Sequence, residues 1–302
     1  MKTRLLAVLF LGVIAMSLTL NADGQGAPGA RGTRAPQPLG QIKAVRVIGD
    51  VKVVRGADKA TIAIKDNDAL TQGDTIITAK NASVVLVFSN GSTVNLAEDS
   101  QLAIDQFLQD PFGQEIKVAD LTAEPTTSHT KLNLTYGELV GNVKKLKGDS
   151  SFIVQTPVGA AGIRGTTFML TYRPSGTGQA FFTLSTASGE LIFQSPNGVP
   201  VPVAAGKAVQ VQVTVDSTTG AVTAVQVQST DISAAAKQTI ETQVTQALAT
   251  VSTTTFTSTP TTTGSDQSNQ QNQQNQNQNQ NQQNPVQQQE LPRTTSGDGG
   301  TG

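Results

Sequence analysis

Short runs of β-branched residues, separated by turn residues, recur along most of the chain, and this pattern limits the possible fold more than any other feature. Runs of about four to eight Val, Ile, Thr and aromatic residues bounded by Gly, Asn, Asp, Ser or Pro indicate β-strands. Nothing in the sequence resembles a βαβ unit, so we expect an all-β fold, either a sandwich or a roll/solenoid-like structure. The predicted strands are 44–48, 51–54, 60–64, 75–78, 83–88, 93–96, 101–104, 131–134, 138–143, 151–155, 166–172, 180–185, 189–194, 199–203, 209–215 and 221–228.

One hairpin stands out from these strands. Asn90-Gly91 separates the run 83–88 from the run 93–96. An Asn-Gly pair between such runs favours a type I′ turn, which needs positive φ at both central residues. The sequence therefore predicts a tight hairpin with this turn at Asn90-Gly91.

The stretch 105–130 is less regular than its surroundings. It contains Pro111-Phe112-Gly113 and a Pro/Thr/Ser segment before His129, which is the chemistry of loops. A long loop inside a compact domain is often functional, so we treat this stretch as a candidate contact surface.

Residues 231–249 form the convincing helix of the sequence. Ala236, Ile240, Val244 and Leu248 recur every four residues, which predicts one apolar stripe on an amphipathic helix. Short helices gain most of their stability from packing, so we expect the stripe to dock on the β domain. Self-association as a short coiled coil is the alternative.

Both ends of the chain differ in composition from the β region at 41–230. Lys2 and Arg4 precede an apolar run, which predicts a signal peptide at 1–22; an uncleaved membrane anchor is the alternative. The Gly/Ala/Pro/Arg-rich segment 23–40 is predicted to be a flexible leader, and the Thr/Ser- and Gln/Asn-rich segment 250–302 a disordered tail. Side-chain ladders between Gln/Asn tracts are an alternative use of that tail.

Composition excludes several classes of function. The net charge is -1 and charged residues make up 14% of the chain, so no basic surface indicates nucleic acid as a partner. The chain has no Cys and a single His, His129, without neighbours that would complete a metal site. No Gly-x-Ser-x-Gly nucleophile motif is present. We therefore predict no catalytic, metal or cofactor-binding residues.

The glycine cluster 159–165 superficially resembles a phosphate-binding loop. A dinucleotide-binding loop is followed directly by a helix. Residues 166–172, which follow this cluster, are rich in β-branched and aromatic residues and are predicted to form a strand. The glycines instead indicate tight turns or close backbone contacts. Arg164, the only charge in the cluster, is expected to bind nearby carbonyl groups or a carboxylate, with contact to a ligand as the alternative.

Several segments together resemble the FecR domain. These are Gly73-Asp74-Thr75, the strand Val85–Phe88 with Asn90–Leu96, and the segment from Phe152 to Phe168. The resemblance covers 51–172, and its most specific element is Thr-Pro-x-x-x-x-Gly-x-Arg-Gly-Thr-x-Phe. The candidate structural or partner-binding residues of this motif are Thr156, Pro157, Gly162, Arg164, Gly165, Thr166 and Phe168.

The resemblance implies an extracytoplasmic all-β domain. FecR proteins of the signalling type relay a signal from an outer-membrane transporter to a cytoplasmic sigma factor through one membrane span. Here only Met1 to Arg4 precede the apolar run, so we expect no sigma-factor regulation and a closer likeness to free-standing exported FecR-domain proteins.

The leading hypothesis is a non-enzymatic binding or scaffold module in the periplasm, on the cell surface or secreted. Its expected partner is an envelope or extracellular protein or glycan, and membrane contact requires an uncleaved N-terminal segment. A component of envelope signalling is the runner-up, and a carbohydrate-active enzyme is the least favoured reading.

Overall fold

The computed structural model describes residues 37–175, 178–195, 198–215 and 222–257. The predicted signal peptide, most of the leader and the tail beyond residue 257 lie outside these ranges. Within them β-strands are the main structure and form two large sheets and one small two-stranded sheet, which confirms the all-β prediction.

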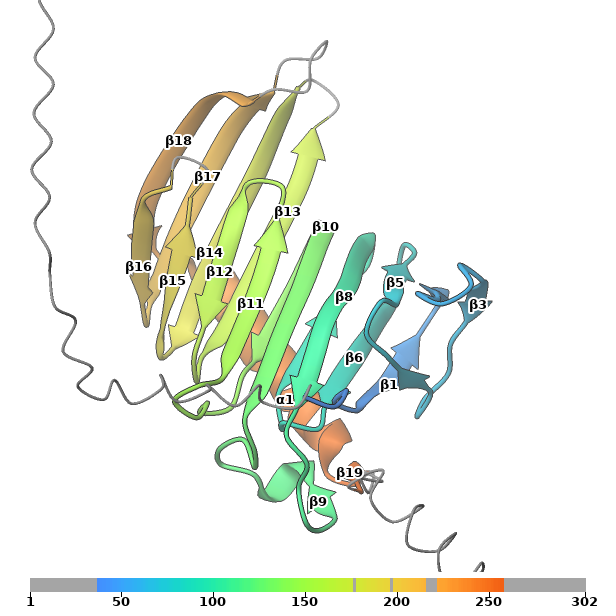
Figure 1. Cartoon of the computed structure of the whole chain (residues 1–302). Helices are drawn as coiled ribbons and strands as arrows, with labels where there is room; N and C mark the ends of the chain where they lie inside the picture. The colour runs from blue at the N-terminus through green and yellow to red at the C-terminus, as the bar shows by residue number, and fades with distance from the viewer. Residues whose placement is uncertain (1–36, 176–177, 196–197, 216–221, 258–302) are drawn as a thin grey trace, which may run out of the picture. The chain divides into compact units, whose positions relative to one another are not determined.

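Sheet A is turned toward the viewer in Figure 1. Its strands pair in a continuous series, antiparallel except between β10 and β11. In spatial order they are β3 (Thr61–Ala63), β2 (Val51–Val54), β5 (Thr75–Thr78), β8 (Ser100–Gln109), β10 (Ser128–Asn142), β11 (Ser151–Thr156), β12 (Gly159–Ile163), β15 (Glu190–Gln194) and β16 (Pro200–Ala204).

Sheet B lies behind sheet A and is wholly antiparallel. In spatial order its strands are β4 (Ala69–Leu70), β1 (Ile42–Ile48), β6 (Ser83–Phe88), β7 (Thr93–Leu96), the second half of β10, β13 (Thr167–Ser175), β14 (Gln179–Ser188), β17 (Lys207–Val215) and β18 (Val222–Asp231).

The long strand β10 belongs to both sheets. Its first half pairs with β8 and β11, and its second half, from Gly137, pairs with β7 and β13. Gly137 has φ +114°, and a Cβ there would collide with the Ser100 hydroxyl. A residue without a side chain therefore lets β10 turn from one sheet into the other.

The chain alternates between the sheets as it advances. The hairpin β11–β12 lies in sheet A, β13–β14 in sheet B, β15–β16 in sheet A and β17–β18 in sheet B. One continuous apolar core fills the space between the layers, with Phe88, Phe152, Phe168, Phe182 and Phe193 fully buried. The structure combines the two predicted architectures. Its two sheets pack face to face as in a sandwich, and the chain passes between them in successive hairpins as in a roll.

The hairpin at Asn90 forms as predicted, but its turn differs from the prediction. β6 pairs with β7, and of the two central residues only Gly91 has positive φ. Asn90 is fully buried: its Oδ1 accepts from the Ser92 N–H at 3.0 Å and its Nδ2 donates to Ser128 Oγ at 3.0 Å. The type I′ prediction was wrong because tertiary hydrogen bonds hold the asparagine side chain inward.

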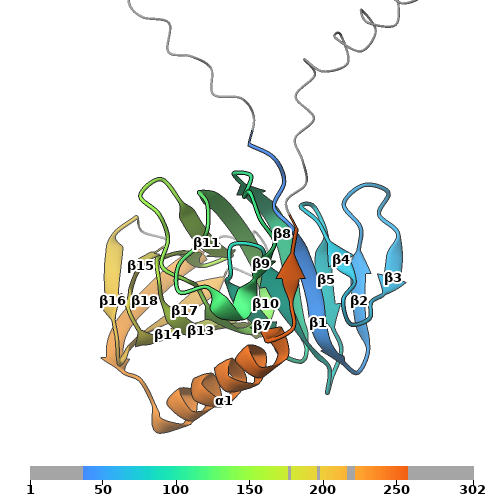
Figure 2. The same cartoon turned by 90° about the horizontal axis from the view of Figure 1, so that it is seen from below.

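The helix α1 (Ala234–Val251) covers the outer face of sheet B, as Figure 2 shows from below. Ser233 caps its N-terminus by accepting from the Ala236 N–H. Ile240 packs against Val140 and Met169, and Ala247 and Val251 pack with Val45, Val85 and Val87. Docking on the β domain is thus confirmed. In the last turns of the helix, however, the buried residues are Ala247 and Val251, whereas Leu248 of the predicted stripe is 42% exposed.

Ordered structure extends into both the predicted leader, 23–40, and the predicted tail, 250–302. Past residue 249, α1 continues to Val251, and β19 (Thr255–Phe256) then pairs with β9 (Ile116–Lys117). At the other end, the Gly40 N–H donates to the Phe107 carbonyl at 2.9 Å, so the last predicted leader residues lie along β8.

The irregular stretch 105–130 is folded rather than open. β8 extends through it to Gln109, and β9 and the 3₁₀ helix η1 (Val118–Asp120) follow. Val118 and Phe256 are buried together at the end of α1. This stretch therefore helps α1 to cover sheet B, and its exposed part borders a surface pocket of about 640 Å³.

Candidate functional site

The predicted motif begins in the turn of the β11–β12 hairpin. The Thr156 hydroxyl accepts from the Val158 N–H at 3.3 Å and donates to the Gly159 carbonyl at 3.0 Å, with Pro157 between them. These bonds close the turn locally. Thr156 and Pro157 also border a hollow of about 430 Å³ on the outer face of sheet A, lined further by Asn133, Gln155, Gly159, Ala160, Gln194 and Ser195.

The second part of the motif forms the corner where the chain leaves sheet A for sheet B. Gly165 has φ +67°, which an L-residue adopts only with strain. The buried Thr166 hydroxyl donates to the Glu190 carbonyl at 3.0 Å, and the Thr166 carbonyl accepts from the Val143 N–H. Phe168, at the start of β13, is fully buried in the core. These residues position the corner.

Arg164 lies on the exposed rim of the same corner. Its Nη2 donates to the Lys147 carbonyl at 2.7 Å, and its Nη1 lies 3.4 Å from the Gly148 carbonyl. Both acceptors belong to the connection between β10 and β11, so the guanidinium ties two loops together. The structure thus shows the expected carbonyl contacts, while contact of Arg164 with a partner stays a prediction.

Unlike Gly165, the motif glycine Gly162 has no surroundings that require a glycine. It is exposed in the middle of β12 with negative φ, and a Cβ there would meet only the Ile192 carbonyl oxygen, at 3.8 Å. Glycine weakens a strand interior, and it often marks a place where another molecule or backbone approaches closely. The position is therefore a candidate contact point.

The strand register places Gly162 between two isoleucines. Ile153 of β11 and Ile192 of β15 are its direct neighbours. Lys131 of β10 lies beside Ile153, and Pro202 of β16 lies beside Ile192. Ile192 is 51% exposed and Pro202 is exposed, whereas Ile153 is half-buried. The next row across the sheet is uncharged and polar, and consists of Asn133, Gln155, Ala160, Gln194 and Pro200.

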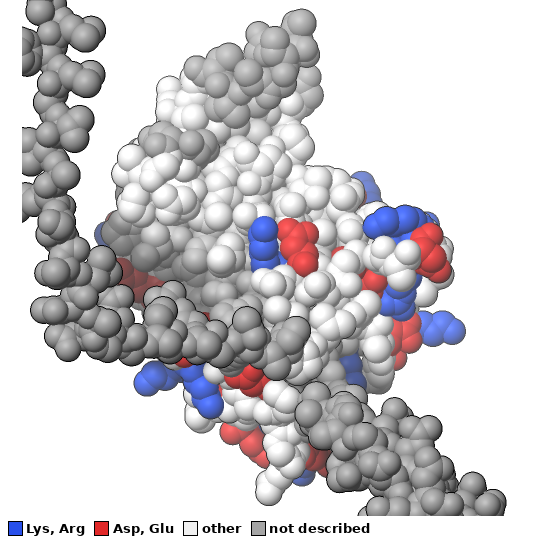
Figure 3. Space-filling model, in the orientation of Figure 1, with Lys and Arg blue, Asp and Glu red and all other residues white. Residues whose placement is uncertain are grey.

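We call the surface made by these two rows the sheet A face. Figure 3 shows mainly uncharged surface on this side of the molecule. One basic and one acidic side chain lie next to each other near its centre, and the other charged side chains lie toward the β2–β5 end and along the lower rim. An exposed apolar row beside side-chain amides is typical of a surface that contacts a partner. The sequence singled out Gly162 but missed Ile153 and Ile192, because only the register brings them together.

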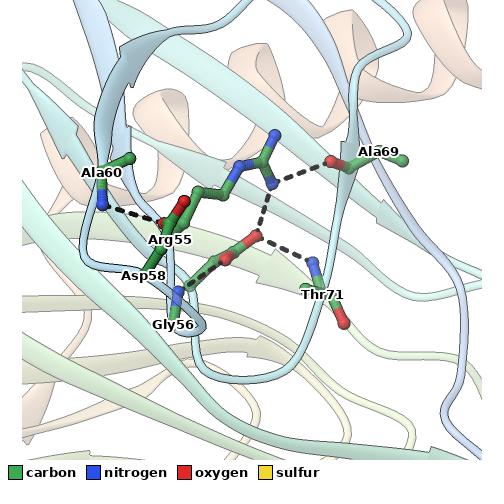
Figure 4. Close-up of polar contacts among 7 residues, drawn as sticks. Arg55, Gly56, Asp58, Ala60, Ala69 and Thr71 are labelled. Atoms are coloured by element: carbon green, nitrogen blue, oxygen red, sulfur yellow. Dashed lines mark hydrogen bonds and ion pairs between the residues drawn. The ribbon is translucent and has the colours of Figure 1, made fainter.

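Asp74, just before β5, anchors a second part of the resemblance, and Figure 4 shows Arg55, Gly56, Ala69 and Thr71, which surround it. Its fully buried carboxylate accepts from Arg55 Nη1 at 2.7 Å, from the Thr71 N–H at 3.0 Å and from the Gly56 N–H at 3.1 Å. Arg55 also donates to the Ala69 carbonyl at 3.1 Å. Each carboxylate oxygen is occupied by donors of the same chain, so this cluster joins loops and offers no vacant ligand position.

The described residues hold no group of three or more His, Asp or Glu side chains placed to bind a metal ion. His129 Nδ1 lies 3.0 Å from Ser151 Oγ, on the neighbouring strand. No described helix has both the length and the apolar character needed to cross a membrane.

A comparison with family models agrees with the resemblance read from the sequence. Residues 74–190 match the family described as FecR protein. The match starts at Asp74 and continues to the first residue of β15, whereas the sequence predicted 51–172. It includes the whole motif from Thr156 to Phe168, so the resemblance to the FecR family is confirmed over these residues.

Among solved structures, the chain resembles two crystal structures of a protein from Parabacteroides distasonis, which is provisionally described as an anti-sigma factor. Identity is 14% in both, the TM-scores are 0.36 and 0.35, and each match covers 53% of this chain and 60% of that chain. A likeness of this strength supports no conclusion about function. A search of curated proteins finds no match.

Proposed function

We propose that this protein, which resembles the FecR family over residues 74–190, is an exported, non-enzymatic binding module that holds an envelope or extracellular protein on the sheet A face. The observation that carries the proposal is Gly162, a motif glycine without a folding requirement, set between Ile153 and Ile192 on a surface with few charges. A missing side chain at this point lets a partner approach the β12 backbone.

The chemistry of the face favours a protein over a glycan. Apart from Lys131, its side chains are aliphatic or amide groups, and the two rows around Gly162 contain no aromatic ring on which a sugar could stack. An apolar centre with a polar, hydrogen-bonding rim is the usual arrangement of a protein interface. Lys131, beside Ile153, is the one charged residue of these two rows, so we expect the association to depend only modestly on salt.

The first experiment tests binding on the face. Cells producing the tagged full-length protein are treated with a crosslinker, and the adducts are identified by mass spectrometry. We expect an envelope-protein adduct with the natural chain and its loss with Gly162→Val, since the new side chain fills the space between the isoleucines. Ala63→Val is the matched control, because Ala63 is exposed on β3 at the other end of sheet A.

An adduct that survives Gly162→Val as well as Ala63→Val would contradict the proposed face. Circular dichroism of both variants shows whether the fold is kept. Cell fractionation tests export separately: we expect the protein in the periplasm, on the surface or in the medium, and recovery only from the cytosol would overturn that part of the proposal.

The FecR-domain match supports a second candidate, a role in envelope signal transduction. In that case the crosslinked partner would be an outer-membrane transporter or a membrane-bound sensor. A partner that is neither would leave the binding role in place and remove the signalling one.

A further inference from the structure

The four terminal strands of the two sheets differ in how their free edges are protected. In the described part of the chain β3, β4, β16 and β18 each pair with one neighbouring strand. β3 has three residues and β4 has two, and β16 contains Pro200 and Pro202, which lack an N–H group. Short strands and prolines are common means of blocking further strand pairing.

β18 has none of these protections. It is ten residues long, with the sequence VTAVQVQSTD, and it contains no Pro, Gly, Lys or Arg. Its single charge is Asp231, at the last position, where the carboxylate pairs with Lys207 Nζ at 2.6 Å. A long, uncharged edge presents a row of main-chain donors and acceptors to another strand.

The side chains of β18 also leave one end of the core incompletely covered. Val225 and Val227 face Val213 and Val211 of β17, but Val227 is 37% exposed and Val225 is only partly buried. A hollow of about 360 Å³ lies close by, bordered by residues of β16, β17 and β18. Repeating β architectures need a cap where the stacking stops, and at this end the described strands supply none.

We propose that a second copy of this chain supplies that cap, through antiparallel pairing of β18 with the partner's β18 about a two-fold axis at Val227. In this register Val227 faces the partner's Val227, and Gln226 faces the partner's Gln228. Residues opposite each other on antiparallel strands point to the same side. Apolar side chains therefore meet apolar ones over the core, and glutamines meet glutamines on the outer side.

The charge pattern fits a second copy. In this register Asp231 lies opposite position 223, so the two acidic ends stay at opposite ends of the new strand pair and no like charges meet. On the outer side Gln226 and Gln228 already face Gln212 and Gln210 of β17, so pairing would extend the existing glutamine pairs across the dimer axis. A self-complementary patch of this kind gives a closed, two-fold symmetric dimer.

This interface is separate from the sheet A face. It uses the edge of sheet B, so each copy keeps its sheet A face available to a partner. Two such faces in one assembly would strengthen attachment to a partner that is clustered in the envelope. The proposed dimer does not depend on the proposed envelope partner, and each can be tested without the other.

The first test is sedimentation velocity of the full chain over a range of concentrations. We expect a monomer–dimer equilibrium, and we expect Val227→Lys to raise the dissociation constant about tenfold or more, because two ammonium groups would face each other at the axis. Phe181→Lys is the matched control, since Phe181 is 48% exposed but lies on β14, inside sheet B. A natural chain that stays monomeric at its highest soluble concentration overturns the proposal.

The second test fixes the register. The chain has no Cys, so Val227→Cys introduces a single thiol. Mild oxidation should then yield a covalent dimer, whereas Phe181→Cys should yield little. A natural chain that dimerises while Val227→Cys fails to crosslink places the interface elsewhere and overturns the proposal. This variant is small and uncharged, so it also remains informative if Val227→Lys disturbs folding.

Discussion

The outer faces of sheets A and B differ in what covers them. On sheet B, α1 and the segment around Val118 and Phe256 bury Val45, Val85, Val87, Val140 and Met169. On sheet A, Ile192 and Gly162 remain exposed. Apolar residues on sheet B thus serve the fold, whereas the fewer exposed apolar residues on sheet A are those that we propose to contact a partner. Variants that separate stability from binding can test this contrast.

The largest effect is expected where α1 packs on sheet B. Ile240→Ala removes a side chain that is 1% exposed and should lower the free energy of unfolding by about 2–5 kcal/mol. Leu248→Ala, on the same helix but 42% exposed, should change it by less than about 0.5 kcal/mol. Urea denaturation of the full chain measures both. Equal losses would mean that the sequence-predicted stripe through Leu248 is the packed one after all.

The next effect separates two glycines of the motif. Gly165→Ala should destabilise the fold by about 1–2 kcal/mol, because φ is +67° at this position. Gly162→Ala should leave stability unchanged or raise it by about 0.5–1 kcal/mol, since alanine fits the strand and restricts the unfolded chain. Thermal and urea unfolding measure the pair. A clear loss of stability in Gly162→Ala would show that this glycine serves the fold and would weaken the sheet A face as a binding site.

Two arginines with similar bonds sharpen the contrast further. Arg164 donates to carbonyls of Lys147 and Gly148, and Arg173 on β13 donates to carbonyls of Asp99 and Glu98. Each change to Ala should cost about 1 kcal/mol of stability.

Only Arg164→Ala should in addition reduce the envelope adduct if the rim of the sheet A face contacts a partner. Unchanged stability together with a weakened adduct would make contact the main role of Arg164. Equal adducts from both variants would assign Arg164 a structural role alone.

The smallest effect concerns the exposed pair of Lys207 and Asp231 at the end of sheet B. The hydrogen bond from Lys207, and then its charge, lower the pKa of the Asp231 carboxyl. Because the folded-state pKa is lowered, the stabilising contribution is present above the unfolded pKa and is lost as the pH falls through the folded one. Lys207→Met should return the pKa toward its ordinary value, as measured by carboxyl NMR titration. An unchanged titration curve would show that the pair does not form in solution.

Much of the fold could be predicted because strand formation depends on local patterns. Runs such as 83–88 and 151–155 became β6 and β11, and the helix at 231–249 was displaced by only a few residues. The predicted boundaries were wrong where tertiary contacts order additional residues. An example is β19, whose Phe256 is buried beside Val118. The predicted turn type at Asn90 was wrong for the same reason, because the Asn90 side-chain amide donates a hydrogen bond to Ser128, which is distant in the sequence.

The candidate site was only half predictable. The motif identified Gly162 and Arg164, because the spacing of residues along the chain can be read directly from the sequence. Ile153 and Ile192 were not identifiable, since their nearness depends on which strands pair and in what register. The family resemblance, confirmed over residues 74–190, named the domain without naming its contact surface.

The sequence by itself determined that this chain would be an all-β domain with a docked helix and the FecR motif, because residue periodicity and turn chemistry are local properties. Only the tertiary structure decided that α1 covers sheet B and leaves the sheet A face open, and that β18 ends its sheet without protection. Those outcomes follow from packing between distant strands, where one shift of register exchanges the buried and exposed sides.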